Sequence, residues 1–228
     1  AAAALPIIRH LAHRADEVLS LAGIVNGTSN FVMTRLEQGL SLEEAVAEAQ
    51  RRGFAEADPS ADLDGADAAA KLSILAYRAF GTWVRPDAFP VRGIRELTPA
   101  DCDLAESMGC RIRLLARAAR VGAALDMAVE PMLLPAWHLL ASVEEEYNAV
   151  YLKCASSGDL SLFGKGAGAL PTATAVLGDL IDLAQHNSVR WPVPQATALA
   201  GVDGHAATTR RHYLRVTGEP HPGLDRRI

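Results

Sequence analysis

The chain has 228 residues, of which 50% are hydrophobic, 21% charged and 5% aromatic, and its formal net charge is −5. This apolar content excludes a disordered chain, and 18 glycines with 12 prolines exclude a coiled coil. No apolar run reaches the ~18 residues of a membrane span, and a mildly acidic chain without a basic stripe is a poor nucleic-acid binder. We therefore expect a globular protein with neither a membrane nor a nucleic acid as its partner.

The cysteine content and the start of the chain indicate the compartment. No charged segment followed by a cleavage site marks the chain for secretion. The three cysteines, Cys102, Cys110 and Cys154, form no C-x-x-C motif and cannot all pair within the chain. A reducing compartment accounts for them most simply, so we expect a cytoplasmic protein.

The first 40 residues are predicted to contain helices around one strand. Residues 5–21 have apolar side chains at near-helical spacing, and residues 19–25 form a strand that ends in a turn at Asn26-Gly27. A helical pattern resumes over residues 31–36.

Two strong helices follow, separated by an acidic loop. Ser41 and Glu44 form a capping box, in which each side chain bonds the backbone N–H of the other, and the helix that begins there ends at Gly53. Residues 54–65 form the loop, and residues 66–80 form the second helix.

The second half of the chain mixes shorter elements. These are a helix over 101–111, paired strands over 113–119 and 125–129, a short helix or strand over 144–153, a glycine-rich turn over 164–168 and a helix over 171–185. Residues from 188 onward are rich in Pro, Gly and His and are predicted to form a loose tail. The sum is an α/β or α+β domain whose first third is rich in helices.

The strongest candidate site surrounds one lysine. Lys71, Lys153 and Lys165 are the only lysines among 22 cationic residues, and a lysine can release a proton where an arginine cannot. Asp67 and Lys71 stand one turn apart on a helix, and Glu56 and Asp62 precede that helix. The spacing therefore predicts a lysine among as many as three carboxylates, suited to proton transfer and to binding a substrate ammonium.

A plainer interpretation of the same residues remains open. Asp67 and Lys71 can form an exposed i,i+4 ion pair worth only ~0.3–0.5 kcal/mol. The neighbours of Lys71 are small or apolar nearly all round the helix, which is typical of a buried helix and favours a site.

Two polar turns are weaker candidates. Residues 26–30 (Asn-Gly-Thr-Ser-Asn) open a helix whose backbone N–H groups suit an anion or a polar cofactor edge, although Asn-Gly is also a common turn. Residues 164–168 (Gly-Lys-Gly-Ala-Gly) match neither a Walker sequence nor a full dinucleotide fingerprint, and such a turn also serves close packing. The histidines and cysteines lack metal-ligand spacing, and no G-x-S-x-G motif occurs.

Taken in order, these blocks resemble homoserine dehydrogenase. The segments that carry the resemblance are Gly23–Phe31, Gln50–Pro59, Asp62–Lys71, Leu75–Gly81, Leu140–Val143, Tyr147–Val150 and Phe163–Thr172. The resemblance implies an α+β fold in which a mixed β-sheet packs against helices, and a homodimer. It also implies an NAD(P)-dependent interconversion of L-aspartate 4-semialdehyde and L-homoserine, on the route to threonine, methionine and isoleucine.

The resemblance also assigns roles to individual positions. Lys71 matches the catalytic proton donor and acceptor. The positions that match substrate-binding residues are Glu56, Asp62, Asp67 and Thr28. The positions that match the cofactor edge are Asn26, Gly27, Thr28, Gly166 and Gly168. Backbone carbonyls of Ala1, Ala3 and Leu5 match a site for a monovalent cation such as sodium.

The family's dinucleotide-binding Rossmann domain has no counterpart in the 228 residues, and Ala3 and Ala4 stand where the family has glycines. We expect residues 1–187 to form the catalytic and dimerisation domain, with 164–187 returning toward the nucleotide-binding domain. Residues 188–228 are expected to be a linker and the truncated start of an ACT-like domain, which His212–Val216 resembles.

Three functions follow from these expectations. The first is the substrate-binding part of a homoserine dehydrogenase, inactive as this chain alone. The second is a noncatalytic remnant or oligomerisation module of the same fold that binds no cofactor. The third is a related dehydrogenase that acts on another small amino-aldehyde.

Overall fold

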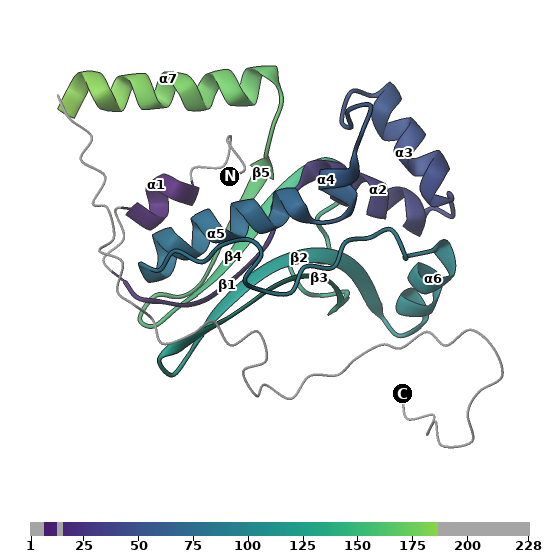
Figure 1. Cartoon of the computed structure of the whole chain (residues 1–228), viewed down its shortest axis with the longest axis horizontal. Helices are drawn as coiled ribbons and strands as arrows, with labels where there is room; N and C mark the ends of the chain where they lie inside the picture. Colours follow the sequence, from purple (N-terminus) through teal and green to yellow (C-terminus); the bar gives the residue numbers. More distant parts are fainter. Residues whose placement is uncertain (1–6, 13–15, 187–228) are drawn as a thin grey trace.

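Five strands form one sheet in the computed structural model, which describes residues 7–12 and 16–186 (Figure 1). The strands are β1 (Val18–Ile24), β2 (Cys110–Val121), β3 (Ala124–Pro135), β4 (Tyr147–Cys154) and β5 (Gly158–Lys165), in the spatial order β3-β2-β1-β4-β5. Every neighbouring pair is antiparallel, and an isolated parallel bridge joins Val91 to Val129. The α+β class is confirmed, although the five strands form an antiparallel sheet and not a mixed one.

The helices agree with the capping signals in the sequence. They are α1 (Ile7–Ala12), α2 (Gly27–Glu37), α3 (Leu42–Arg51), α4 (Ser60–Leu63), α5 (Ala66–Phe80), α6 (Pro99–Ser107) and α7 (Ala169–His186). The capping box of α3 is present, and its hydrogen bond from the Ser41 backbone lowers the pKa of Glu44. Helix α5 has the predicted bounds and ends at Gly81, whose φ of 75° is a left-handed conformation that glycine adopts without strain.

Three local predictions were wrong. The pattern over residues 5–21 does not form one helix, because α1 ends at Ala12 and β1 begins at Val18. The helix predicted over 101–111 is too long, because α6 ends at Ser107 and β2 begins at Cys110. The helix start predicted at residues 26–30 is confirmed, with the Asn26 side chain as the cap of α2. The loop over 54–65 contains the short helix α4, and the edge strand β5 lacked a predicted counterpart because its alternating residues are only half-buried.

The two faces of the sheet carry different side chains. In β4, Val150, Leu152 and Cys154 join the main core beneath the helices, whereas Tyr147 and Ala149 alternate with them onto the opposite face. This alternation follows from the two-residue period of a strand. The opposite face has a smaller apolar cluster, which is partly covered by the segment that follows β3.

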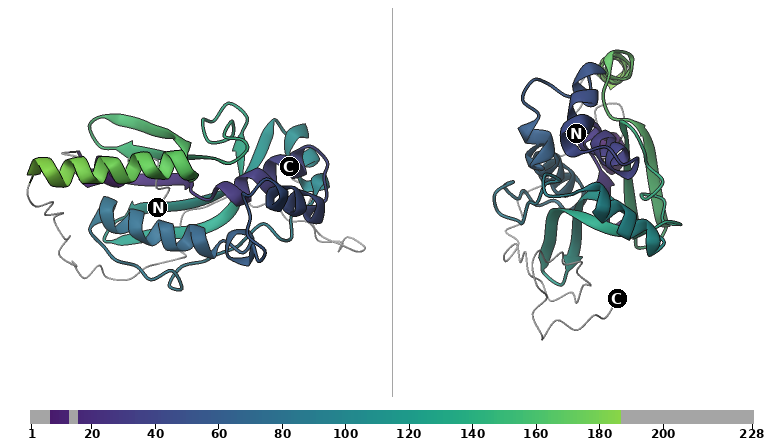
Figure 2. Two further views of the ribbon diagram at one scale, coloured as in Figure 1. Left: turned by 90° about the horizontal axis from the view of Figure 1, so that it is seen from above. Right: turned by 90° about the vertical axis from the view of Figure 1, so that its right-hand side faces the viewer.

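Helix α7 follows β5 and lies away from the other helices (Figures 1 and 2). Its apolar side chains are exposed, among them Leu170 at 81% and Leu177 at 59%. Within the described residues, no helix combines the length and the apolar character needed to cross a membrane. The tail from residue 188, including the ACT-like segment His212–Val216, lies outside the described residues.

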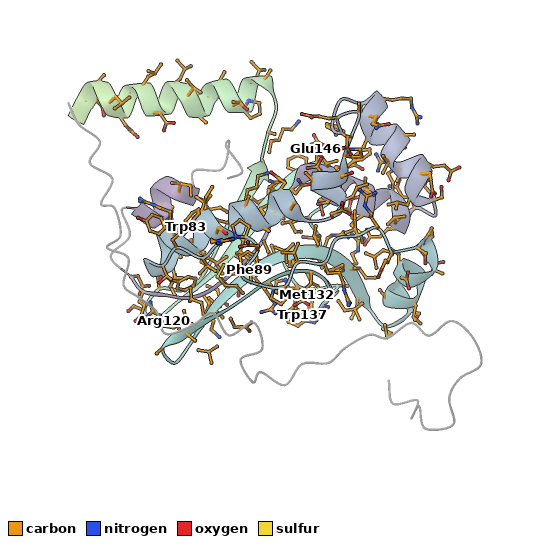
Figure 3. The ribbon with its side chains drawn as sticks, viewed as in Figure 1. Trp83, Phe89, Arg120, Met132, Trp137 and Glu146 are labelled. Atoms are coloured by element: carbon orange, nitrogen blue, oxygen red, sulfur yellow. The ribbon has the colours of Figure 1, made fainter. Side chains whose placement is uncertain are left out.

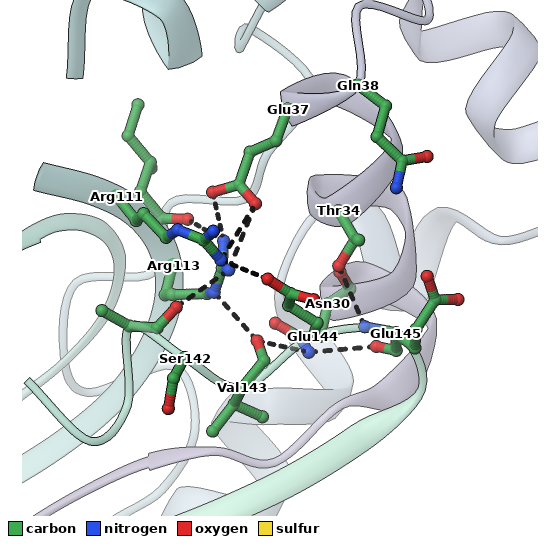
Figure 4. Close-up of polar contacts among 12 residues, drawn as sticks. Asn30, Thr34, Glu37, Gln38, Arg111, Arg113, Ser142, Val143, Glu144 and Glu145 are labelled. Atoms are coloured by element: carbon green, nitrogen blue, oxygen red, sulfur yellow. Dashed lines mark hydrogen bonds and ion pairs between the residues drawn. The ribbon is translucent and has the colours of Figure 1, made fainter. Parts of the chain in front are cut away.

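A fully buried arginine joins α2 to the sheet (Figure 4). Arg113 of β2 is 0% exposed and pairs with both carboxylate oxygens of Glu37, with its Nη1 2.6 Å from Glu37 Oε1. It also donates to the backbone carbonyls of Ile112, Ala141 and Val143. The guanidinium is therefore compensated by one carboxylate and three carbonyls, as burial of a charge requires.

We predict that Arg113→Ala lowers the free energy of unfolding by about 3–5 kcal/mol, because it leaves Glu37 and three carbonyls without their donor. The matched control is Arg111→Ala, on the same strand, whose half-exposed ion pairs with Glu37 and Glu144 are worth less than about 1 kcal/mol. Urea denaturation measures both. Equal losses in the two variants would contradict the assigned burial.

Candidate functional site

Lys71 lies in the second turn of α5, beside Val25 at the end of β1. Its Nζ is 2.6 Å from Asp67 Oδ2 and donates to the backbone carbonyl of Val25 at 3.0 Å. The side chain is 25% exposed and that of Asp67 33%. The ammonium has three N–H donors, and these two contacts leave one for another oxygen. Lys71 is thus oriented by two fixed acceptors while remaining accessible.

Asn26 connects the two aspartates that precede Lys71. Its Nδ2 donates to Asp62 Oδ1 at 2.6 Å and to Asp67 Oδ2 at 2.7 Å, and its Oδ1 accepts from the Ser29 backbone at 2.7 Å. Asp62 lies on α4 and Asp67 in the first turn of α5. The start of α2 therefore gathers carboxylates from two other helices around Lys71.

The structure places the remaining predicted substrate residues differently. Thr28 Oγ1 donates to the Phe54 carbonyl at 2.6 Å, which ties the loop after α3 to the start of α2. Glu56 is exposed, and its backbone carbonyl accepts from Gln50. Within the described residues, Asp67 is the one predicted carboxylate that pairs with Lys71. Asp62 is joined to this pair through Asn26, and no ion pair joins the Glu56 carboxylate to the lysine.

Helix α5 is not buried all round, contrary to the sequence-based expectation. Ala66, Ala70 and Ile74 form an exposed stripe, whereas Leu72 and Leu75 are within the core. Small alanines satisfy an apolar pattern on either face, so composition alone did not separate the two sides. Lys71 lies at the boundary between them.

The two predicted cofactor turns meet at a buried asparagine that the sequence analysis did not single out. Asn148 of β4 is 2% exposed, and its Oδ1 has no hydrogen-bond partner among the described residues. A Cβ at Gly166 would lie 2.1 Å from Asn148 Nδ2, and one at Gly27 would lie 2.7 Å from the Glu146 carbonyl. Both glycines are therefore required by close packing around Asn148. The sequence does carry a signal for Asn148. It is a polar residue two positions before the core residue Val150, and therefore on the same, core-facing side of the strand.

The segment before β4 is attached to α2 by polar contacts. Asn30 Nδ2 donates to the carbonyls of Val143, Glu145 and Tyr147 at 3.0–3.3 Å. Arg35 pairs with the Glu145 carboxylate at 2.7 and 2.9 Å, which raises the pKa of Arg35. These contacts fix the carbonyl of Glu146 against Gly27, and the Glu146 carboxylate forms an ion pair of 3.2 Å with Lys165.

The thiol of Cys102 is not reactive, and the described residues present no metal cluster. Burial raises the pKa of Cys102 to about 12, so its thiol stays protonated at neutral pH. Among residues 7–12 and 16–186, no group of three or more His, Cys, Asp or Glu side chains could hold a metal ion. The predicted cation site at Ala1, Ala3 and Leu5 lies outside these residues.

Comparison with known proteins gives one consistent result. The family model of homoserine dehydrogenase matches residues 6–181. A homoserine dehydrogenase of Mycobacterium leprae is 39% identical over 98% of this chain and 53% of its own length. The chain thus spans about half the length of the curated relatives it matches.

Solved structures that resemble this chain are also homoserine dehydrogenases. A homoserine dehydrogenase from Thiobacillus denitrificans has a TM-score of 0.80 and 39% identity, over 87% of this chain and 48% of its own. A mutant of a hyperthermophilic archaeal homoserine dehydrogenase in complex with NADPH has a TM-score of 0.68 and 29% identity, over 81% of this chain and 53% of its own.

We predict that Gly166→Ala lowers the free energy of unfolding by about 1–3 kcal/mol, because the new Cβ meets the buried Asn148 side chain. In an Asn148→Ala background the same substitution should cost less, since alanine lacks the Cγ, Nδ2 and Oδ1 atoms that the new Cβ would meet. Urea denaturation of the two single variants and the double variant measures the coupling. An equal cost in both backgrounds would show that the two residues do not touch.

Proposed function

This chain belongs to the homoserine dehydrogenase family of oxidoreductases, and on that premise we propose that the complete protein interconverts L-aspartate 4-semialdehyde and L-homoserine with NAD(P)(H). The reaction belongs to threonine, methionine and isoleucine biosynthesis, and we place it in the cytoplasm. The observation that carries the proposal is the Lys71 ammonium, oriented by Asp67 and by the Val25 carbonyl with one donor left for a substrate oxygen.

Lys71 moves the proton at the substrate oxygen. In the direction of reduction, its ammonium donates a proton to the aldehyde oxygen as that oxygen becomes a hydroxyl. In the direction of oxidation, the neutral amine accepts the hydroxyl proton. Asp67 stabilises the ammonium form and, with the Val25 carbonyl, keeps Nζ from rotating away from the substrate.

The carboxylates bind the amino acid part of the substrate. Asp62 and Asp67 put two negative charges beside the single positive charge of Lys71. The excess negative charge suits the substrate ammonium, which a carboxylate binds through charge-assisted hydrogen bonds. Glu56 is exposed on the neighbouring loop and adds to this attraction. Thr28 contributes by holding that loop at the start of α2.

The start of α2 and the turn after β5 are suited to hold the reacting end of the cofactor. NAD(P)(H), when bound, accepts or supplies the hydride. Gly27, Gly166 and Gly168 allow close backbone approach, and Asn148 Oδ1 is a buried acceptor whose hydrogen bond is unmade among the described residues. The nucleotide part needs the dinucleotide-binding domain that the family resemblance implies. We therefore expect the 228-residue chain alone to be inactive.

The Lys71 role predicts a specific loss of activity. In the complete protein, Lys71→Ala should lower kcat by ~10²–10⁴, because the proton at the substrate oxygen loses its donor. Lys153→Ala is the matched control, since Lys153 is exposed on β4 and should tolerate the change. Steady-state assays of homoserine oxidation measure both. An unchanged kcat in Lys71→Ala would contradict the proton-transfer role of Lys71 and favour a noncatalytic oligomerisation module.

We further propose a homodimer formed through the sheet face opposite the helices. Trp137, labelled in Figure 3, is 83% exposed, and Phe163 is 61% exposed. Ring contacts connect Trp137 through His138 to Tyr151, and Tyr147 stacks on Phe163 at 5.1 Å. Exposed aromatic side chains on one sheet face are typical of a protein interface.

The dimer proposal predicts that Trp137→Glu weakens self-association at least about tenfold, because it buries a charge in the apolar contact. Trp83→Glu is the control, since Trp83 is 54% exposed but follows α5 and packs on Tyr77. Sedimentation equilibrium measures the dissociation constants. Equal weakening in both variants, or a monomeric parent, would contradict the assigned face.

A further inference from the structure

The Asn26 side chain has all of its strong hydrogen-bonding groups engaged within the protein. It is 4% exposed, and the Ser29 N–H donates to its Oδ1. Because a backbone N–H can donate only to the oxygen, the amide nitrogen must point the other way, toward the carboxylates of Asp62 and Asp67. Both amide hydrogens are thereby used. Asn26 has no donor left for a cofactor, although its position in the family motif implies a cofactor contact.

We propose that Asn26 is a positioning residue, which sets Asp62 and Asp67 side by side and holds Asp67 on Lys71. Two neighbouring carboxylates repel each other, and a neutral group that donates one hydrogen to each brings them together without cancelling their charge. Asp67 Oδ2 accepts the hydrogen bond of Asn26 Nδ2 and also forms the ion pair with Lys71 Nζ. The same contact therefore couples the proton-transferring lysine to the ammonium-binding pair.

One oxygen of each carboxylate is bound by Asn26, and the other is left without a protein partner among the described residues. Asn26 engages Asp62 Oδ1 and Asp67 Oδ2. Among the described residues, Asp62 Oδ2 and Asp67 Oδ1 make no hydrogen bond to protein. Both remain for the ammonium group of a small amino acid. Asn26 thus determines selectivity for an aminated substrate without touching it. This inference rests on the proposed function.

The test uses Asn26→Ser in the full 228-residue chain. Serine keeps the cap of α2, but its single short hydroxyl cannot bridge two carboxylates. The matched control is Asn30→Ser, the same substitution four residues later on α2, at a residue that is 2% exposed and bonds the carbonyls of Val143, Glu145 and Tyr147 instead. If Asn26→Ser does not fold, Asn26→Asp replaces it, since aspartate keeps the size and the cap but lacks both donors.

The readout is the NMR signal of the lysine side chains in protein labelled with ¹³C,¹⁵N-lysine. The chain has three lysines, so Lys71→Arg assigns the Lys71 signal, and exposed Lys153 gives the solvent reference. We expect the Lys71 Cε and Nζ shifts to move toward those of Lys153 in Asn26→Ser and to stay at the parent values in Asn30→Ser. An unmoved Lys71 signal in folded Asn26→Ser overturns the proposal, as does an equal movement in Asn30→Ser.

A ligand titration separates this inference from the proposed function. L-Homoserine and 4-hydroxybutanoate, which lacks the amino group, are added to each variant while the Lys71 signal is followed. We expect the unsubstituted chain to bind L-homoserine more tightly than 4-hydroxybutanoate. In Asn26→Ser the ratio of the two affinities should fall at least about tenfold. If L-homoserine does not change the Lys71 signal of the unsubstituted chain, the proposed substrate is wrong. The comparison of the ligand-free variants still decides the role of Asn26. A preference kept intact in Asn26→Ser overturns the selectivity role.

Discussion

Helix α2 carries buried polar side chains along its whole length, and their hydrogen bonds hold it in place because an unmade hydrogen bond in the core is costly. Asn26 at its start bonds two aspartates, Asn30 bonds three carbonyls of the segment before β4, and Glu37 at its end pairs with the buried Arg113. These partners come from α4, α5, the sheet and a loop. A shift of α2 would break all of them at once, so its position constrains the rest of the fold.

The candidate site is a consequence of this constraint. The start of α2 is held between the carboxylates on one side and Asn148 with the Gly166 turn on the other. The lysine for proton transfer and the glycines that allow close backbone approach are thereby brought to one place, although Lys71 and Gly166 are 95 positions apart in the chain. Arg35 reinforces the arrangement, since its guanidinium contacts the Glu145 carboxylate and stacks 4.2 Å from the centre of the Phe31 ring.

The sheet separates two kinds of contact. Its helix-covered face provides the main core and supports the site, whereas the other face carries exposed aromatic side chains. Since the same strand β4 carries Asn148 on one face and Tyr147 on the other, association through the outer face would also brace the strand that positions Asn148. Stability of the site and self-association are therefore linked through one strand in the proposed dimer.

Much of this protein follows from local sequence signals. The capping box at Ser41, the bounds of α5 and the pairing of β2 with β3 were predictable, because caps, glycine stops and alternation depend on neighbours in the chain. The Asp67–Lys71 pair followed from helical spacing. The family also followed from the order of its motifs.

Other features depended on contacts between distant segments. The bridge from Asn26 to Asp62 and the packing of Gly166 against Asn148 join residues of different elements. No local pattern specifies which partner a buried amide will find. The exposure of Glu56 and of one stripe of α5 likewise depends on what packs against each surface. The sequence by itself determined which residues can do the chemistry, and the tertiary structure decided which of them meet, because only the folded chain shows how each buried polar group is paired.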